Sequence, residues 1–181
     1  MSQHPPLPRR LGMIISQFPE VHETFIMREL AALEAGGIPL RIYSLKRCSD
    51  RIVHPEAQDL LQHTAYVLLR DPRTIGAAFV EALRQPRLAL STLGWVVRHH
   101  AWPPLTLFKA VAVWLQAMAM APRMRRDGVT HIHAHWATMP TTAAGITSRW
   151  LGLRFSFTAH AWDIFVRNPS LGMKVRLAEQ V

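Results

Sequence analysis

The first 45 residues contain the pattern that most restricts the fold, because two apolar runs flank one helix. The apolar run at 11–16 leads through a loop, 17–23, into a segment with helical spacing of apolar residues at Ile26, Leu30 and Leu33. Gly36 and Gly37 end that helix, and residues 40–45 alternate as a second strand. A strand, a helix and a strand within about 35 residues are typical of a right-handed parallel βαβ unit.

The same alternation returns in the last third of the chain, after Gly128. Here the sequence predicts strands at 129–133 and 154–158, a helix at 140–151 and a final helix at 171–180. Residues 65–69 predict one more strand. We therefore expect an α/β fold, a Rossmann-like parallel sheet of about five strands with helices on both faces.

The middle of the chain is predicted to be helical and to be divided by prolines. The expected helices span 73–84, 87–100 and 105–125. Residues 105–121 are nearly all apolar, but this stretch of 17 residues is shorter than the roughly 20 that cross a bilayer. We expect a helix that packs on the sheet or lies at an interface.

Composition indicates one domain with an anionic partner. The chain has 181 residues, 49% of them hydrophobic, and a net charge of +9. No helix-turn-helix, RNP or zinc-finger pattern organises the basic residues, so we expect no nucleic-acid partner. Residues 1–10 are predicted to be a flexible leader, and the apolar run after them is too short for a signal peptide. With Cys48 as the single cysteine, a cytoplasmic protein is expected.

The loop between the first strand and the first helix is the first place to look for a site, because open α/β sheets bind ligands beyond the carboxyl ends of their strands. Residues 16–24 contain no glycine, which excludes a dinucleotide fingerprint and a P-loop. Two interpretations stay open. Residues 22–24 cap the helix in an ordinary turn, or the loop faces a ligand.

Three histidines alternate along the strand predicted near residue 131. Alternation places His131, His133 and His135 on one face, as would suit a zinc site. A metal-dependent hydrolase built on these three histidines is therefore one alternative. The interpretation that we favour keeps His131 and His133 as polar residues of the strand edge, with His135 alone reaching the cleft.

His160 follows the last predicted strand directly. An imidazole at the carboxyl end of a strand can act on a substrate as general acid, general base or hydrogen-bond donor. The alternative is a buried histidine bonded to Asp163, three residues further on. We favour a functional His160, because its position and its polarity agree.

Three segments together resemble family 4 glycosyltransferases, most closely those that make bacterial exopolysaccharides such as colanic acid. The segments are Phe18-Pro19 followed by residues 23–26, then residues 133–137, then residues 157–165. They occur in the family's order, and the resemblance extends over residues 11–181. Members have two Rossmann-like domains, the GT-B arrangement, and transfer a sugar from a nucleotide-sugar with retention of configuration.

The resemblance implies that residues 11–181 are the N-terminal, acceptor-side domain, without the C-terminal donor domain, so the isolated chain is expected to be inactive. It implies a substrate-binding set of Glu23, Thr24, His135 and Asp163, with His160 as the catalytic residue facing the donor sugar. The acceptor would be a glycan or a lipid-linked glycan, with neither a cofactor nor a metal required. A non-catalytic module that docks on an anionic membrane or a partner transferase is the third possibility.

Overall fold

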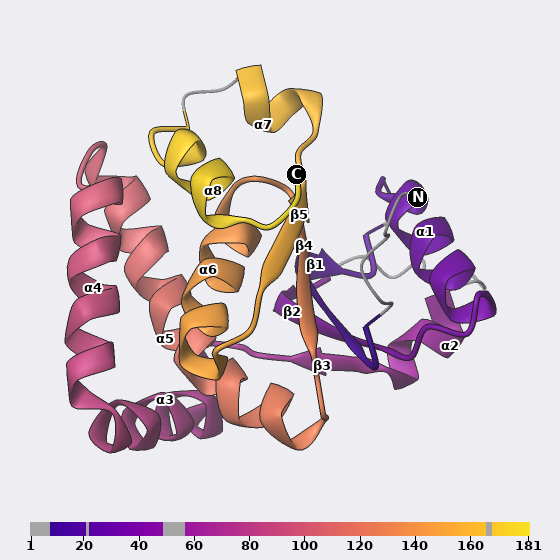
Figure 1. Cartoon of the computed structure of the whole chain (residues 1–181), viewed down its shortest axis with the longest axis horizontal. Coiled ribbons are helices and arrows are strands. Elements are labelled where there is room, and N and C mark those ends of the chain that lie inside the picture. Colours follow the sequence, from indigo (N-terminus) through magenta and orange to yellow (C-terminus); the bar gives the residue numbers. More distant parts are fainter. Residues whose placement is uncertain (1–7, 21, 49–56, 166–167) are drawn as a thin grey trace, which may run out of the picture.

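The computed structural model describes residues 8–20, 22–48, 57–165 and 168–181, and its centre is a parallel sheet of five strands (Figure 1). Every neighbouring pair runs parallel, in the order β3-β2-β1-β4-β5. The strands are β1 (Leu11–Phe18), β2 (Leu40–Arg47), β3 (Thr64–Tyr66), β4 (His131–His135) and β5 (Phe155–Thr158). The predicted Rossmann-like α/β fold is thereby confirmed. Residues 1–7 of the predicted leader lie outside the described residues.

Helices lie on both sides of this sheet, as predicted (Figure 1). On one side are α1 (Thr24–Ala35) and α2 (Ala57–Gln62). The other side carries α3 (Pro72–Arg84), α4 (Pro86–His100), α5 (Pro104–Arg126) and α6 (Met139–Leu151). Two short helices, α7 (Ala161–Phe165) and α8 (Leu171–Leu177), follow β5.

The alternation of side chains along β1 explains why there are two hydrophobic cores. Met13 and Ile15 point to one face and join the core formed with α1 and α2, whereas Ile14 points to the other face and joins the core of α3 to α6. All three side chains are completely buried. A strand buried on both faces has to be apolar at every position, which is the run seen in the sequence.

The apolar helix α5 is a core helix of this fold. It packs against α3, α4 and α6, and its side-chain amide at Gln116 donates hydrogen bonds to the Leu45 and Val67 carbonyls at 2.7 and 2.5 Å. Among the described residues it is the one helix with the length and composition of a membrane span, and 44% of its most apolar window is buried. Its burial agrees with the expected helix packed on the sheet.

Several predicted boundaries were wrong. β1 continues two residues past Ser16, because Gln17 and Phe18 still pair with β2. The fourth strand begins at His131 rather than Val129, whose N–H bonds to Met124 in the turn that ends α5. The third strand has three residues, at 64–66 rather than 65–69, and α2 was not predicted.

The end of the chain is extended rather than helical. We expected a helix over 171–180, but α8 ends at Leu177. Beyond it, the Glu179 N–H bonds to the Phe155 carbonyl at 2.8 Å, and the Phe157 N–H bonds to the Gln180 carbonyl at 3.2 Å. These bonds place a short parallel bridge along the outer edge of β5.

Candidate functional site

The strand order reverses between β1 and β4, and this reversal marks the candidate site. From β1 the chain first builds outward through β2 and β3, and then returns to the other side of β1 with β4 and β5. The loops after β1 and β4 therefore diverge, and open α/β sheets bind ligands in the crevice that results. The residues predicted for function come from the start of α1, from the end of β4, and from the loop and helix α7 that follow β5.

The three histidines of β4 share the face of the sheet that α1 covers. His133 lies opposite Met13 of β1 and opposite Ser156 of β5. Its Nδ1 is 2.8 Å from the Ser156 hydroxyl, and its Nε2 is 3.1 Å from the Thr158 hydroxyl. His131, at the amino end of the strand, also contacts the Ser156 hydroxyl, at 2.8 Å. Burial lowers the pKa of His133 to about 4 and also lowers the pKa of His131.

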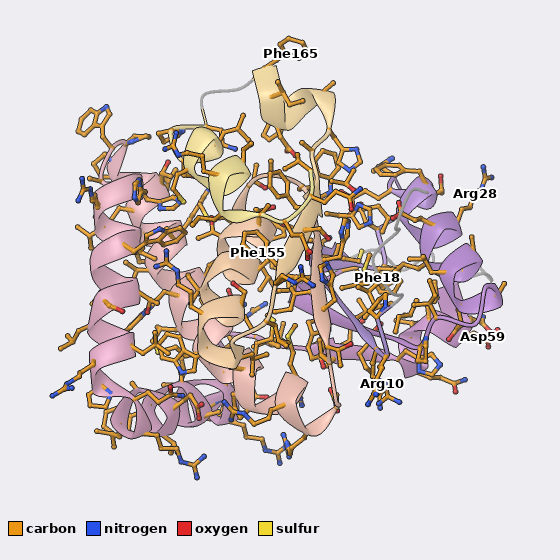
Figure 2. The ribbon with its side chains drawn as sticks, viewed as in Figure 1. Arg10, Phe18, Arg28, Asp59, Phe155 and Phe165 are labelled. Atoms are coloured by element: carbon orange, nitrogen blue, oxygen red, sulfur yellow. The ribbon has the colours of Figure 1, made fainter. Side chains whose placement is uncertain are left out.

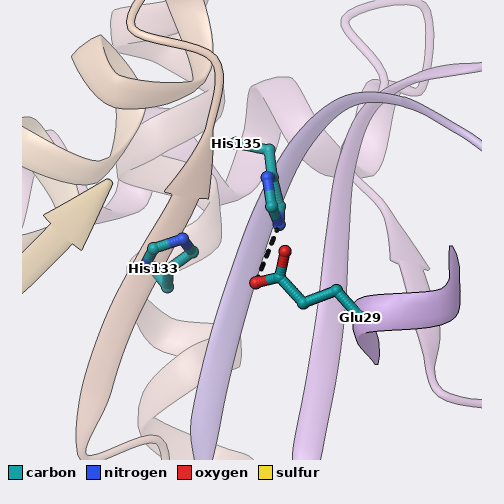
Figure 3. Close-up of side chains that lie close together, drawn as sticks. All are labelled: Glu29, His133 and His135. Carbon is teal, nitrogen blue, oxygen red and sulfur yellow. Dashed lines mark ion pairs between the residues drawn. The ribbon is translucent and has the colours of Figure 1, made fainter. Parts of the chain in front are cut away.

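His135 is buried and faces a carboxylate of α1 that the sequence analysis did not identify. Its side chain is fully shielded, and its Nε2 lies 3.6 Å from Glu29 Oε1 (Figure 3). Neither ring nitrogen of His135 makes a hydrogen bond within the described part of the chain. The contact with the His135 ring lowers the pKa of the partly exposed Glu29. No local pattern connects the two residues, because they are neighbours only through the pairing of β4 with β1.

His160 stands in an aromatic cluster at the carboxyl edge of the sheet. Its ring centroid is 4.4 Å from Trp136, 5.0 Å from Phe25 and 5.9 Å from His135, onto which it stacks. Burial, followed by the neighbouring His135, lowers the pKa of His160. Its Nε2 is shielded and has no hydrogen-bond partner among the described residues. His160, the predicted catalytic residue, is therefore packed against the rings of Trp136 and Phe25, and its Nε2 has no hydrogen-bond partner among the described residues.

Trp136 adopts a backbone conformation that residues other than glycine rarely take. Its φ is +76°, in the left-handed region. The conformation is held by neighbouring bonds, since its N–H donates to the Thr158 carbonyl at 3.0 Å and its carbonyl accepts from the Thr141 hydroxyl at 2.7 Å. Such strained residues cluster at functional sites, where the surrounding structure determines them.

Asp163 ties the two loops of the site together. Its Oδ2 accepts the Ala137 N–H at 2.6 Å and the His160 N–H at 3.3 Å, so it bonds the loop after β4 and the loop after β5 at once. The bond to His160 also caps the start of α7. Asp163 is fully buried. In this structure the Asp163 carboxylate binds the backbone N–H groups of Ala137 and His160. The substrate contact expected for Asp163 stays a prediction.

A buried lysine also binds the loop that follows β4. Lys174 of α8 donates to the Ala137 and Thr138 carbonyls at 2.9 and 2.7 Å. Burial lowers the pKa of Lys174 to about 7, although the Asp163 carboxylate opposes this shift. Asp163 and Lys174 therefore fix the turn after β4 through its N–H and its carbonyl groups, respectively.

Glu23 and Thr24 lie half-buried at the start of α1. Burial and the neighbouring Glu20 raise the pKa of Glu23, whereas the Trp136 side chain lowers it. Glu23 occupies the position that precedes the helix, but its side chain makes no capping hydrogen bond. The backbone turns before the helix, with the Glu23 N–H bonded to the Glu20 carbonyl at 3.1 Å, but the side-chain cap considered for residues 22–24 is not seen at Glu23, whose carboxyl lies beside the Trp136 side chain.

Comparison with known proteins does not assign the chain to a family. No protein-family model matches the chain, and no curated protein is significantly similar to it.

Proposed function

We propose that residues 11–181 form the acceptor-side domain of a retaining glycosyltransferase that uses a nucleotide-sugar donor. The observation that carries this proposal is the group formed by His160, Trp136 and Phe25 beside Glu23, at the strand-order reversal. A group that combines aromatic rings with a few polar side chains suits a ligand with apolar faces and many hydroxyls. A sugar has this character.

His160 is the group that we assign to the donor sugar. Its Nε2, which has no hydrogen-bond partner among the described residues, would supply one hydrogen bond to that sugar, and the Asp163 carboxylate fixes the His160 backbone. A donor that is already oriented stabilises charge as it develops in the transition state, because it needs no reorganisation at that moment. Glu23, whose pKa is raised, would accept a hydrogen bond from an acceptor hydroxyl.

A second domain would close the site from the other side. Exposed apolar side chains gather on α7, where Trp162 is 66% and Phe165 is 87% exposed. Figure 2 shows Phe165 at the outer end of that helix. Exposed apolar patches on soluble domains commonly mark an interface. We assign this one to the nucleotide-binding domain that the resemblance implies.

We also place the protein on the cytoplasmic side of the membrane, with peripheral contact to anionic lipid. The net charge of +9 supports this contact, since headgroups carry the opposite charge. Flotation with anionic vesicles tests it. The protein should float with the vesicles at low salt and be released at high salt, because screening weakens the attraction. Equal flotation with neutral vesicles contradicts an electrostatic contact.

The decisive experiment on this chain is glycan binding. We expect the 181-residue protein to bind oligosaccharide repeats of bacterial exopolysaccharides, detected by saturation-transfer NMR. Glu23→Gln should weaken that binding at least about tenfold, since it replaces a charged acceptor. His131→Gln is the matched control, because His131 lies at the amino end of β4 and contacts Ser156. Absence of any glycan binding, or equal weakening in the control, contradicts the proposal.

A further inference from the structure

Three ligand groups from two elements converge where β4 meets α1. A carboxylate oxygen of Glu29 and one ring nitrogen each of His133 and His135 lie within 4.8 Å of one another. Within this group, His135 Nε2 and Glu29 Oε1 are 3.6 Å apart (Figure 3). Zinc bonds of about 2.0–2.2 Å in a tetrahedron put ligand atoms about 3.3–3.6 Å apart. This pair already has the spacing of two zinc ligands.

His135 provides a second, independent observation. Its side chain is completely buried, and both of its ring nitrogens lack a hydrogen-bond partner among the described residues. Buried polar atoms in native proteins are almost always satisfied, so an unsatisfied one calls for an explanation. The Nε2 atom points to Glu29, into the cluster (Figure 3). A cation between them would satisfy both the nitrogen and the carboxylate.

His133 has the outer contact that metal-binding histidines usually show. Its two nitrogens contact the hydroxyls of Ser156 and Thr158. Binding a cation through one nitrogen replaces one of these contacts and keeps the other. The contact that remains fixes the tautomer and the orientation of the ring, as outer hydrogen bonds do for zinc-bound imidazoles.

We infer that Glu29, His133 and His135 bind a divalent transition-metal ion of the zinc class. Two imidazoles and one carboxylate suit zinc better than magnesium or calcium, which prefer all-oxygen sites. Three protein ligands leave one position open for a water or a substrate oxygen. This set differs from the three histidines considered from the sequence, because Glu29 replaces His131. The inference goes beyond the proposed glycosyl transfer and does not depend on it.

Calorimetric titration of zinc chloride into the untagged, chelator-treated 181-residue protein tests this site. We expect one zinc ion per chain. Glu29→Gln should weaken zinc binding at least about 100-fold, because even the loss of an outer hydrogen bond costs about 10–100-fold. Glu34→Gln is the matched control, since Glu34 lies on the same helix and pairs with His63 instead. His131→Gln should also bind zinc like the wild type.

Loss of zinc binding in Glu29→Gln has to be distinguished from loss of folding. Glu29 is partly exposed, so Glu29→Gln should fold even where a substitution of the buried His135 does not, and thermal melting checks this. Replacing zinc with cobalt should give the visible absorption of a tetrahedral site in the wild type and lose it in Glu29→Gln. The inference is overturned if the wild type binds no zinc, if Glu29→Gln and Glu34→Gln bind it equally, or if His131→Gln abolishes binding. Glycan binding by chelator-treated protein is measured separately, so failure of one proposal leaves the other standing.

Discussion

At the scale of single residues, the site depends on side chains that bond main chain and so hold other side chains in place. Asp163 accepts two backbone N–H groups, and Trp136 keeps a left-handed conformation between two hydrogen bonds. Together they set the positions from which His160 and His135 project. The chemistry that we propose therefore depends on main-chain hydrogen bonds as well as on the groups that would face a substrate.

His160→Ala should lower kcat about 100-fold in a complete enzyme that carries this domain. The reason is that a preoriented donor acting mainly in the transition state is lost, so turnover falls more than binding. His131→Ala should change kcat much less. Steady-state kinetics of both variants, with thermal melts to confirm folding, makes the comparison. Near-normal turnover by folded His160→Ala, with none by folded His131→Ala, would refute the assignment.

Asp163→Ala should destabilise the fold by about 1–3 kcal/mol. It removes the acceptor of the buried Ala137 N–H, and an unsatisfied buried group costs about that much. Urea unfolding measures the difference. Asp59→Ala is the control, because Asp59 is also an acidic residue in the first turn of a short helix but is exposed. The control should stay within about 0.5 kcal/mol of the wild type. An equal loss of unfolding free energy in the two variants would show that the hydrogen bonds of Asp163 do not stabilise the fold.

At the scale of elements, α4 and α6 meet at a buried histidine. His100 is 1% exposed, its Nδ1 is 3.1 Å from the Val96 carbonyl, and its Nε2 is 3.4 Å from the Thr142 hydroxyl. Burial, with Lys174 of α8 nearby, lowers the pKa of His100 from 6.5 to about 4. The contact between these helices is therefore formed with a neutral imidazole.

This contact makes stability depend on pH. The unfolded chain binds a proton at His100 below pH 6.5, whereas the folded chain does so only near pH 4. Stability is therefore complete above pH 6.5 and is lost as the pH falls to about 4, by about 3 kcal/mol from this group. His100→Gln should reduce the loss between pH 7 and pH 4 by that order, as measured by urea unfolding. An unchanged pH dependence would contradict the assignment.

The elements themselves could largely be predicted from the sequence, whereas the site could be predicted only in part. Strands and helices follow local periodicity, so β2, α3 and α6 lie within a residue or two of their predicted positions. Boundaries set by pairing between distant strands were missed, as at the end of β1. Glu29 was missed for the same physical reason, since sheet pairing brings it to His135. His160 and Trp136 belong to segments that the sequence analysis singled out, and their convergence is seen only in the fold.

At the scale of the whole molecule, we propose that the described part of the chain supplies one wall of a two-walled site. The candidate residues lie at one edge of the sheet, and the exposed apolar helix α7 stands beside them. A transfer reaction needs donor and acceptor to be held together, which accounts for a large part of the barrier reduction in such enzymes.

The 181-residue protein alone should therefore transfer no sugar from any nucleotide-sugar. The expected result is background hydrolysis only, measured by release of nucleotide and by mass spectrometry of the acceptor. Addition of the donor domain in the same or a separate chain should restore transfer. Measurable turnover by rigorously purified protein without it would show that this wall is sufficient.

The pairing of Glu179 and Gln180 with β5 also bears on how the protein behaves at high concentration. An open edge strand can recruit strands from other copies and start fibrous aggregation. Here one edge is the three-residue β3, and residues 179 and 180 pair along the other, with Glu179 also paired to Arg154. A variant that stops at Leu177 should scatter more light on concentration than the 181-residue chain. Residues 178–181 would then protect the outer edge of β5 against self-association.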